Sequence, residues 1–202
     1  MLLRVAWWSI AVGLVLEAVL LAMAAVAGKA GSISPFVADL VQKVSWSYLV
    51  CMGLAVGAAV GRAARGAVMG LMGLLCAPAA FAIARALHKG ATKALDLEAG
   101  PAGPSPWLLA GIKAVQYGCF GLVLAWAVNR YSASLKVHLG VGAIVAIVFG
   151  GMIVGLAVAQ TPTPPAVAIT SRAVNELLFP LGCAFALFAA SAVAEKATGV
   201  ED

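Results

Sequence analysis

The sequence predicts an all-α integral membrane protein whose single domain contains six transmembrane helices. Hydrophobic residues occupy 63% of the 202 positions and charged residues only 10%, whereas a soluble domain averages roughly 45–50% and about 25%. The apolar residues also gather in six runs, each long enough to cross about 30 Å of hydrocarbon. A soluble fold of this length cannot bury so much apolar surface, but a bilayer accepts it when every backbone group is bonded within a helix.

Each apolar run is bounded by polar or basic residues. The first run follows Arg4 and carries Trp7 and Trp8 near one membrane face. It has twenty-three residues, more than the roughly 7–15 of a secretory signal core, so we interpret it as a span rather than a cleaved signal peptide. The six predicted spans are residues 5–27, 45–61, 66–88, 107–129, 137–160 and 169–194.

Polar and proline-rich segments divide the chain between these spans. Residues 34–44 are amphipathic, and we expect them to lie at the membrane interface before the second span. Pro78 predicts a kink in the third span. Residues 89–106 form the most polar connection, which separates the two halves, and residues 161–165 break the chain before the last span.

The net charge of +5 arises from basic residues at the ends of the apolar runs. In a soluble chain this charge would suggest nucleic acid, but here it marks membrane flanks, and no nucleic-acid partner is expected. The short loops at 62–65 and 130–136 carry arginine or lysine and no acidic residue. They favour a bacterial-type inner (cytoplasmic) membrane location with both termini on the cytoplasmic side.

One segment of the chain occurs twice. Residues 51–62 (CMGLAVGAAVGR) recur 68 positions later as residues 119–130 (CFGLVLAWAVNR), with six of twelve positions identical. Spans 2 and 4 run in the same direction, so a true repeat predicts a parallel relation of helices 2 and 3 to helices 4 and 5. Chance similarity between Ala-rich and Gly-rich spans explains the same match, and both interpretations stay open.

Small residues recur at every fourth position in both copies, as in the G-x-x-x-G pattern. They are Gly53, Gly57 and Gly61 in the first copy and Gly121 and Ala125 in the second. Such spacing lets helix backbones approach closely, which matters in lipid because no hydrophobic force drives helices together. We therefore expect helices 2 and 4 to form a central packed pair.

Glu17 is the foremost candidate for a functional polar group within the membrane. It lies about 18 Å along the first span, and Gln116 in the fourth span reaches nearly the same level from the other surface. Lys113 is about one turn from Gln116 on the same helix face. A cluster of Glu17, Gln116 and Lys113 would bind an ion, relay a proton or hold a polar substrate. A glutamate that only hydrogen-bonds a neighbouring helix or a partner subunit is the slightly favoured interpretation, and a lipid-facing carboxyl is the third.

Asn175 and Glu176 in the last span form a second candidate. Pro180 cannot donate a backbone hydrogen bond to the carbonyl of residue 176, and freed carbonyls often mark ion or substrate sites in transporters. A surface ion pair between Arg172 and Glu176, beside an ordinary proline kink, explains the same residues and is the favoured interpretation.

The sequence gives little support for a disulfide, a metal or cofactor site, or an enzyme active site. The four cysteines lie inside apolar runs without a C-x-x-C spacing, so a disulfide, a metal site or a bound cofactor is not expected. His88 and His138 are expected near opposite surfaces. No nucleophile elbow or phosphate-binding loop is present in the sequence, which argues against an enzyme, and no motif identifies a family.

We therefore expect a transporter or channel protomer for a small solute or ion, with Glu17 as its mid-membrane polar site. The alternative is a non-catalytic membrane subunit that scaffolds or anchors a larger complex. Besides lipid, we expect partners to be further copies of the chain or other membrane subunits. A transporter should line an internal cavity with Glu17 or Gln116, whereas a scaffold should turn its glycine faces outward.

Overall fold

The computed structural model describes residues 2–28, 33–97, 104–131, 134–160 and 166–198. All regular structure in these ranges is helical, and six of the helical segments are long and apolar enough to cross a membrane. The predicted six-helix membrane class is therefore confirmed. Segment 161–165, and residues 98–103 of the predicted linker, lie outside the described residues. The elements are α1 (Leu2–Val26), α2 (Ile33–Ala58), α3 (Arg62–Ala94), α4 (Pro106–Arg130), α5 (Leu135–Val145), η1 (Ala146–Gly150), α6 (Gly151–Gln160) and α7 (Ala166–Thr198).

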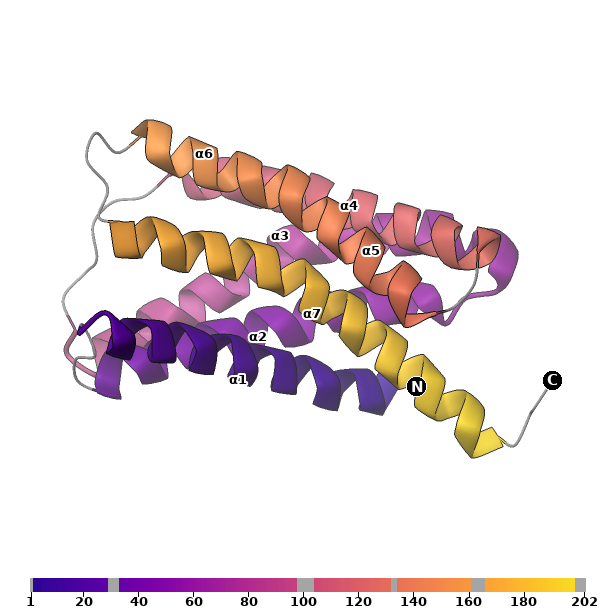
Figure 1. The fold of residues 1–202 in the computed structure, drawn as a ribbon, viewed down its shortest axis with the longest axis horizontal. Coiled ribbons are helices and arrows are strands. Elements are labelled where there is room, and N and C mark those ends of the chain that lie inside the picture. The colour runs from indigo at the N-terminus through magenta and orange to yellow at the C-terminus, as the bar shows by residue number, and fades with distance from the viewer. Residues whose placement is uncertain (1, 29–32, 98–103, 132–133, 161–165, 199–202) are drawn as a thin grey trace.

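The helices form a closed bundle (Figure 1). Helix α1 packs against α2 and α7, α3 lies between α2 and α4, and α5 packs against α4 and α7 to complete the ring. Helix α1 begins at one end of the bundle, and α7 ends there (Figure 1). Helices α2, α4 and α7 begin at the opposite end.

Helix α3 separates the two helices that carry the repeated segment. Helices α2 and α4 barely touch, because each packs along α3 instead. The expected central pair of helices 2 and 4 is therefore wrong, and the internal repeat is not confirmed. The spacing of the small residues shows which face of each helix allows close packing, but it does not show which other helix will pack there.

The small residues of the repeated segment mostly face α3. A Cβ on Gly57 would lie 2.6 Å from Met69 Cα, and one on Gly53 would lie 2.7 Å from the Cys76 sulfur. A Cβ on Gly121 would overlap the carbonyl of Met69. Ala125 is also buried, whereas Gly61, at the N-cap of α3, lies in open space. Helix α3 is thus held between two surfaces of small side chains.

Helix α2 is continuous from Ile33 to Ala58. The expectation that residues 34–44 form a separate interfacial segment is therefore not met. The predicted span of residues 45–61 had only seventeen residues, and joining it to the preceding segment gives a helix that crosses the bilayer comfortably. The polar face of that segment, with Asp39 and Lys43, consequently lies inside the bundle wall rather than on the membrane surface.

Helices α5, η1 and α6 form one rod with a π-helical turn at Ala146–Gly150. At the end of this turn a Cβ on Gly150 would lie 3.1 Å from the backbone oxygen of Glu176 in α7. The glycine thus lets the rod approach α7 closely beside a charged residue. Such π-turns often occur at functional sites in helices. Helices α3 and α7 both continue through their internal prolines, Pro78 and Pro180.

Candidate functional site

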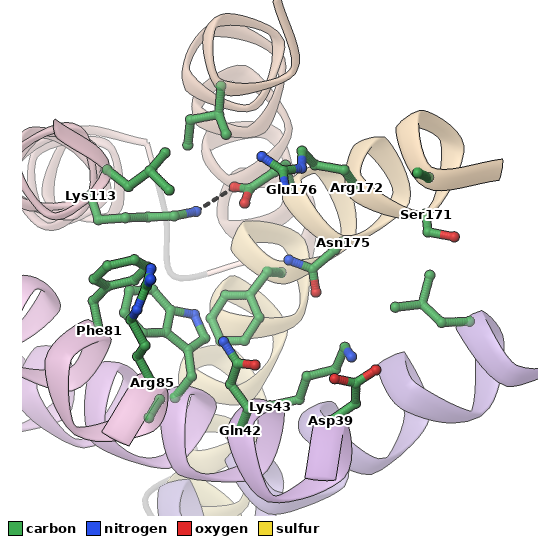
Figure 2. A pocket seen from close by; sticks show the side chains of 17 residues that line it. Asp39, Gln42, Lys43, Phe81, Arg85, Lys113, Ser171, Arg172, Asn175 and Glu176 are labelled. Carbon is green, nitrogen blue, oxygen red and sulfur yellow. Dashed lines mark hydrogen bonds and ion pairs between the residues drawn. The ribbon is translucent and has the colours of Figure 1, made fainter. Parts of the chain in front are cut away.

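A cavity of about 430 Å³ lies within the bundle, toward the end where α2, α4 and α7 begin. We call this end the cavity end. Six elements, α1, α2, α3, α4, α6 and α7, contribute to its walls. Figure 2 shows the polar side chains converging on it from several helices. The charged and polar lining consists of Asp39, Gln42, Lys43, Arg85, Lys113, Ser171, Arg172, Asn175 and Glu176.

The polar lining lies at membrane depth. Lys113 is seven residues into α4 and Glu176 is ten residues into α7. At 1.5 Å per residue these positions are about 10 Å and about 15 Å from the cavity end. Charged groups at such depth cost free energy and are usually paired or directed into a cavity. Here they line one cavity.

Lys113 and Glu176 form an ion pair across the cavity. The Lys113 ammonium donates to Glu176 Oε2, and both side chains are buried. Figure 2 shows Lys113 reaching from α4 toward Glu176 on α7. The same ammonium lies 5.7 Å from the ring centroid of Trp46, so an aromatic face and a carboxylate share one cation.

Glu17 and Lys43 form a second ion pair, between α1 and α2. Its location follows from the close packing of these helices one turn away. A Cβ on Gly13 would lie 2.8 Å from Val44 Cα, and Ser47 donates a 2.6 Å hydrogen bond to the carbonyl of Ser9. This packing directs the buried Glu17 carboxylate toward Lys43, whose side chain lines the cavity.

The remaining charged groups of the lining are Asp39, Arg85 and Arg172, on three helices. His88, outside the lining, has its Nε2 3.0 Å from Asp39 Oδ1, and this contact joins α3 to α2 at the cavity end. Arg85 and Arg172 also line the cavity. Neither arginine forms an ion pair with another side chain in the described part of the chain. Their guanidinium groups are therefore the cations of the lining that have no carboxylate partner in the described residues.

One wall of the cavity is aromatic. Trp46, Phe81 and Phe179 line it. The ring centroid of Trp46 lies 6.3 Å from that of Phe81 and 5.7 Å from that of Phe179. Tyr117 supports this cluster from behind, 5.7 Å from Trp46. The cavity therefore offers an apolar aromatic surface beside its charged groups.

The residues singled out from the sequence are distributed between the two ion pairs and the lining. Glu17 pairs with Lys43, and Lys113 pairs with Glu176 rather than with Glu17. Asn175 lines the cavity. Gln116 is fully buried outside the lining, and its amide has no hydrogen-bond partner in the described residues. Glu176 contacts Lys113, not the expected Arg172. A binding role for any of these residues stays a prediction.

The sequence did not single out Lys43 and Arg85 as site residues. Lys43 belongs to residues 34–44, which the sequence predicts at the membrane interface. The shortness of the following span, residues 45–61, is the signal that these residues belong to the same helix. Arg85 lies nine residues before the end of the long helix α3, inside the predicted span of residues 66–88. In the bundle Arg85 lines the same cavity as Lys113.

The described residues hold no group of three or more His, Cys, Asp or Glu side chains arranged for a metal ion. Cys51 and Cys183 are free thiols whose sulfurs lie 2.9 Å apart, in the buried contact of α2 with α7. His88 and His138 lie at opposite ends of the bundle, since one is near the end of α3 and the other near the start of α5.

The fold and the site together define an integral membrane protein of six apolar helices with a charged cavity inside the bundle. Comparison with family models, with curated proteins and with solved structures gives no match.

Proposed function

We propose that the protein is a transporter or channel protomer that moves a small polar solute or ion across the membrane. The cavity of about 430 Å³ at membrane depth carries this proposal. A membrane chain places charged side chains at depth mainly for ion pathways, substrate sites or proton relays. A cavity of this volume also falls within the roughly 300–1,000 Å³ of small-molecule sites.

The glycine faces favour the same function over the scaffold alternative. Gly53, Gly57 and Gly121 are used for packing against α3 inside the bundle. The cross-cavity pair of Lys113 and Glu176 joins α4 to α7, two helices with little direct packing between them. A polar solute that replaces either partner of this pair would loosen that connection, as alternating access requires.

Flux through proteoliposomes tests the proposal. Vesicles containing pyranine would report proton movement, and light scattering would report the entry of acetate, 3-phenylpropionate, methylamine and glycerol. We expect protein-dependent flux of at least one probe, reduced at least tenfold by Lys113→Met because that change leaves Glu176 unpaired in the cavity. Lys93→Met is the matched control, since Lys93 is exposed near the end of α3.

Absence of flux for every probe from vesicles that contain folded protein would contradict a transport function. Equal protein-dependent flux in the Lys113→Met and wild-type proteins would contradict a pathway through the cavity that this pair spans. Glu17→Gln tests the role of Glu17 separately. Unchanged flux with an unchanged pH dependence would limit Glu17 to stabilising α1 against α2.

A non-catalytic membrane subunit is the second candidate. Gly151 and Gly155 lie one turn apart on α6, and a Cβ on either would meet no other atom within 4 Å in the described structure. Small residues at this spacing on an open face favour close packing with a second copy or another membrane subunit. This role predicts a stoichiometric complex lost on Gly151→Leu, with no flux in reconstituted vesicles.

A further inference from the structure

We infer that the cavity binds a small organic monoanion, whose acidic group meets the cationic side chains while its apolar body lies on the aromatic wall. This inference rests on the proposed transport function and names its substrate class. Two observations support it: the balance of charge around the cavity, and the aromatic wall that lies beside the basic groups.

The lining has more cations than anions. Lys43, Arg85, Lys113 and Arg172 contribute four positive charges, and Asp39 and Glu176 contribute two negative ones. Glu17, which pairs with Lys43 from behind the lining, adds a third negative charge. With His88, the partner of Asp39, counted as neutral, the net charge is +1. One anionic solute makes the site neutral, whereas a cation would raise its charge to +2 in a medium that screens charge poorly.

The basic groups come from different helices and are suited to hold a carboxylate. In Figure 2 Arg172 lies beside Glu176, and Arg85 extends alongside Phe81 toward the level of Lys113. A guanidinium presents a planar set of donors that matches both oxygens of a carboxylate, which an ammonium cannot do. Within the protein, the carboxylate of Glu176 already accepts a charge-assisted hydrogen bond from the Lys113 ammonium.

The aromatic wall explains why an organic anion is favoured over a small inorganic one. Trp46, Phe81 and Phe179 expose apolar surface to the cavity, and Leu20, Leu109 and Ile153 add to it. A hydrated inorganic anion would gain nothing from this surface. An aryl or alkyl carboxylate would bury its body there while its acidic group stays among the charges.

In this arrangement the carboxylate of Glu176 competes with the bound anion for the ammonium of Lys113. Removing its charge with Glu176→Gln should therefore strengthen anion binding. A residue that only maintained the shape of the cavity would have the opposite effect when changed.

Isothermal titration of the purified full-length protein with four probes of similar body tests the inference. The probes are 3-phenylpropionate, 3-phenylpropanol, 3-phenylpropylamine and phenylalanine. We expect saturable binding of 3-phenylpropionate, tighter than that of the other three. Arg172→Gln and Arg85→Gln should each weaken it at least about tenfold, the effect of losing a charge-assisted hydrogen bond. Arg62→Gln, an exposed arginine at the other end of α3, is the matched control.

Equal or tighter binding of the amine, the alcohol or phenylalanine would overturn the inference. So would an affinity for 3-phenylpropionate that neither arginine variant changes. If the glutamine variants do not fold, Arg172→Lys keeps the charge and should still lower the affinity. Saturable anion binding without flux would leave this inference standing and overturn transport, whereas flux of other probes without anion binding would do the reverse.

Discussion

The predicted and the observed environments of Lys43 differ. The sequence places it on the polar face of an amphipathic segment, where water would solvate it. In the bundle its ammonium meets Glu17, and its side chain is largely buried. A lysine or carboxylate at membrane depth costs about 2.5–3.5 kcal/mol on insertion scales, so each residue of this pair depends on the other.

The pair of Glu17 and Lys43 should behave as a unit in stability measurements. Glu17→Gln leaves a buried ammonium without its counter-charge, which typically costs about 3–5 kcal/mol. We expect a clearly lower midpoint of thermal unfolding in detergent for Glu17→Gln and for Lys43→Gln. The double variant should recover most of the loss, because no isolated charge remains. Losses that simply add in the double variant would show that the two side chains do not interact.

Glu17 could be predicted as important from its depth alone, but its partner could not. Depth along a helix follows from residue counting, since the rise per residue is constant. The direction in which the side chain points depends on which helix packs beside it. The sequence suggested Gln116 and Lys113 from their level in the membrane, whereas the packing of Gly13 against Val44 brings Lys43 to Glu17 instead.

At the scale of helices, small residues control how α2, α3 and α4 assemble. Gly73 of α3 is the closest approach, because a Cβ there would overlap the carbonyl of Tyr117 in α4. Tyr117 belongs to the aromatic cluster behind Trp46. Close packing at Gly73 therefore also positions the aromatic wall of the cavity.

Alanine substitutions at two glycines separate packing from helix propensity. Gly73→Ala should destabilise the protein by about 1–3 kcal/mol, because two backbones must move apart. Gly155→Ala adds the same methyl group where nothing lies within 4 Å, and it should be neutral or slightly stabilising. Thermal unfolding of the two variants in the same detergent checks this difference. Equal midpoints would contradict the close packing of α3 on α4.

Only part of the architecture of the whole molecule could be predicted from its sequence. Hydropathy and length predicted six spans because each span must satisfy the bilayer on its own. The order of helices around the ring, the cavity and the partners of its charged residues depend on packing among all six. Resemblance between residues 51–62 and 119–130 suggested direct contact of two helices that α3 holds apart. The π-turn beside Glu176 had no recognisable signal.

A cavity that serves a polar solute must be reachable from water, and cysteine labelling measures this directly. Asn175→Cys places a thiol in the lining, and Ile144→Cys places one on α5 where the side chain is 62% exposed on the outer surface of the bundle. The wild-type protein, with its four native cysteines, is the blank. The reagent is the charged, membrane-impermeant methanethiosulfonate ethylsulfonate, added to each side of sealed vesicles.

We predict that the reagent modifies Asn175→Cys from at least one side and leaves Ile144→Cys at the level of the wild-type blank, because lipid excludes the charged reagent from that position. An Asn175→Cys thiol that resists the reagent from both sides, yet reacts fully after denaturation in detergent, would show a dry cavity and contradict a solute site within the bundle.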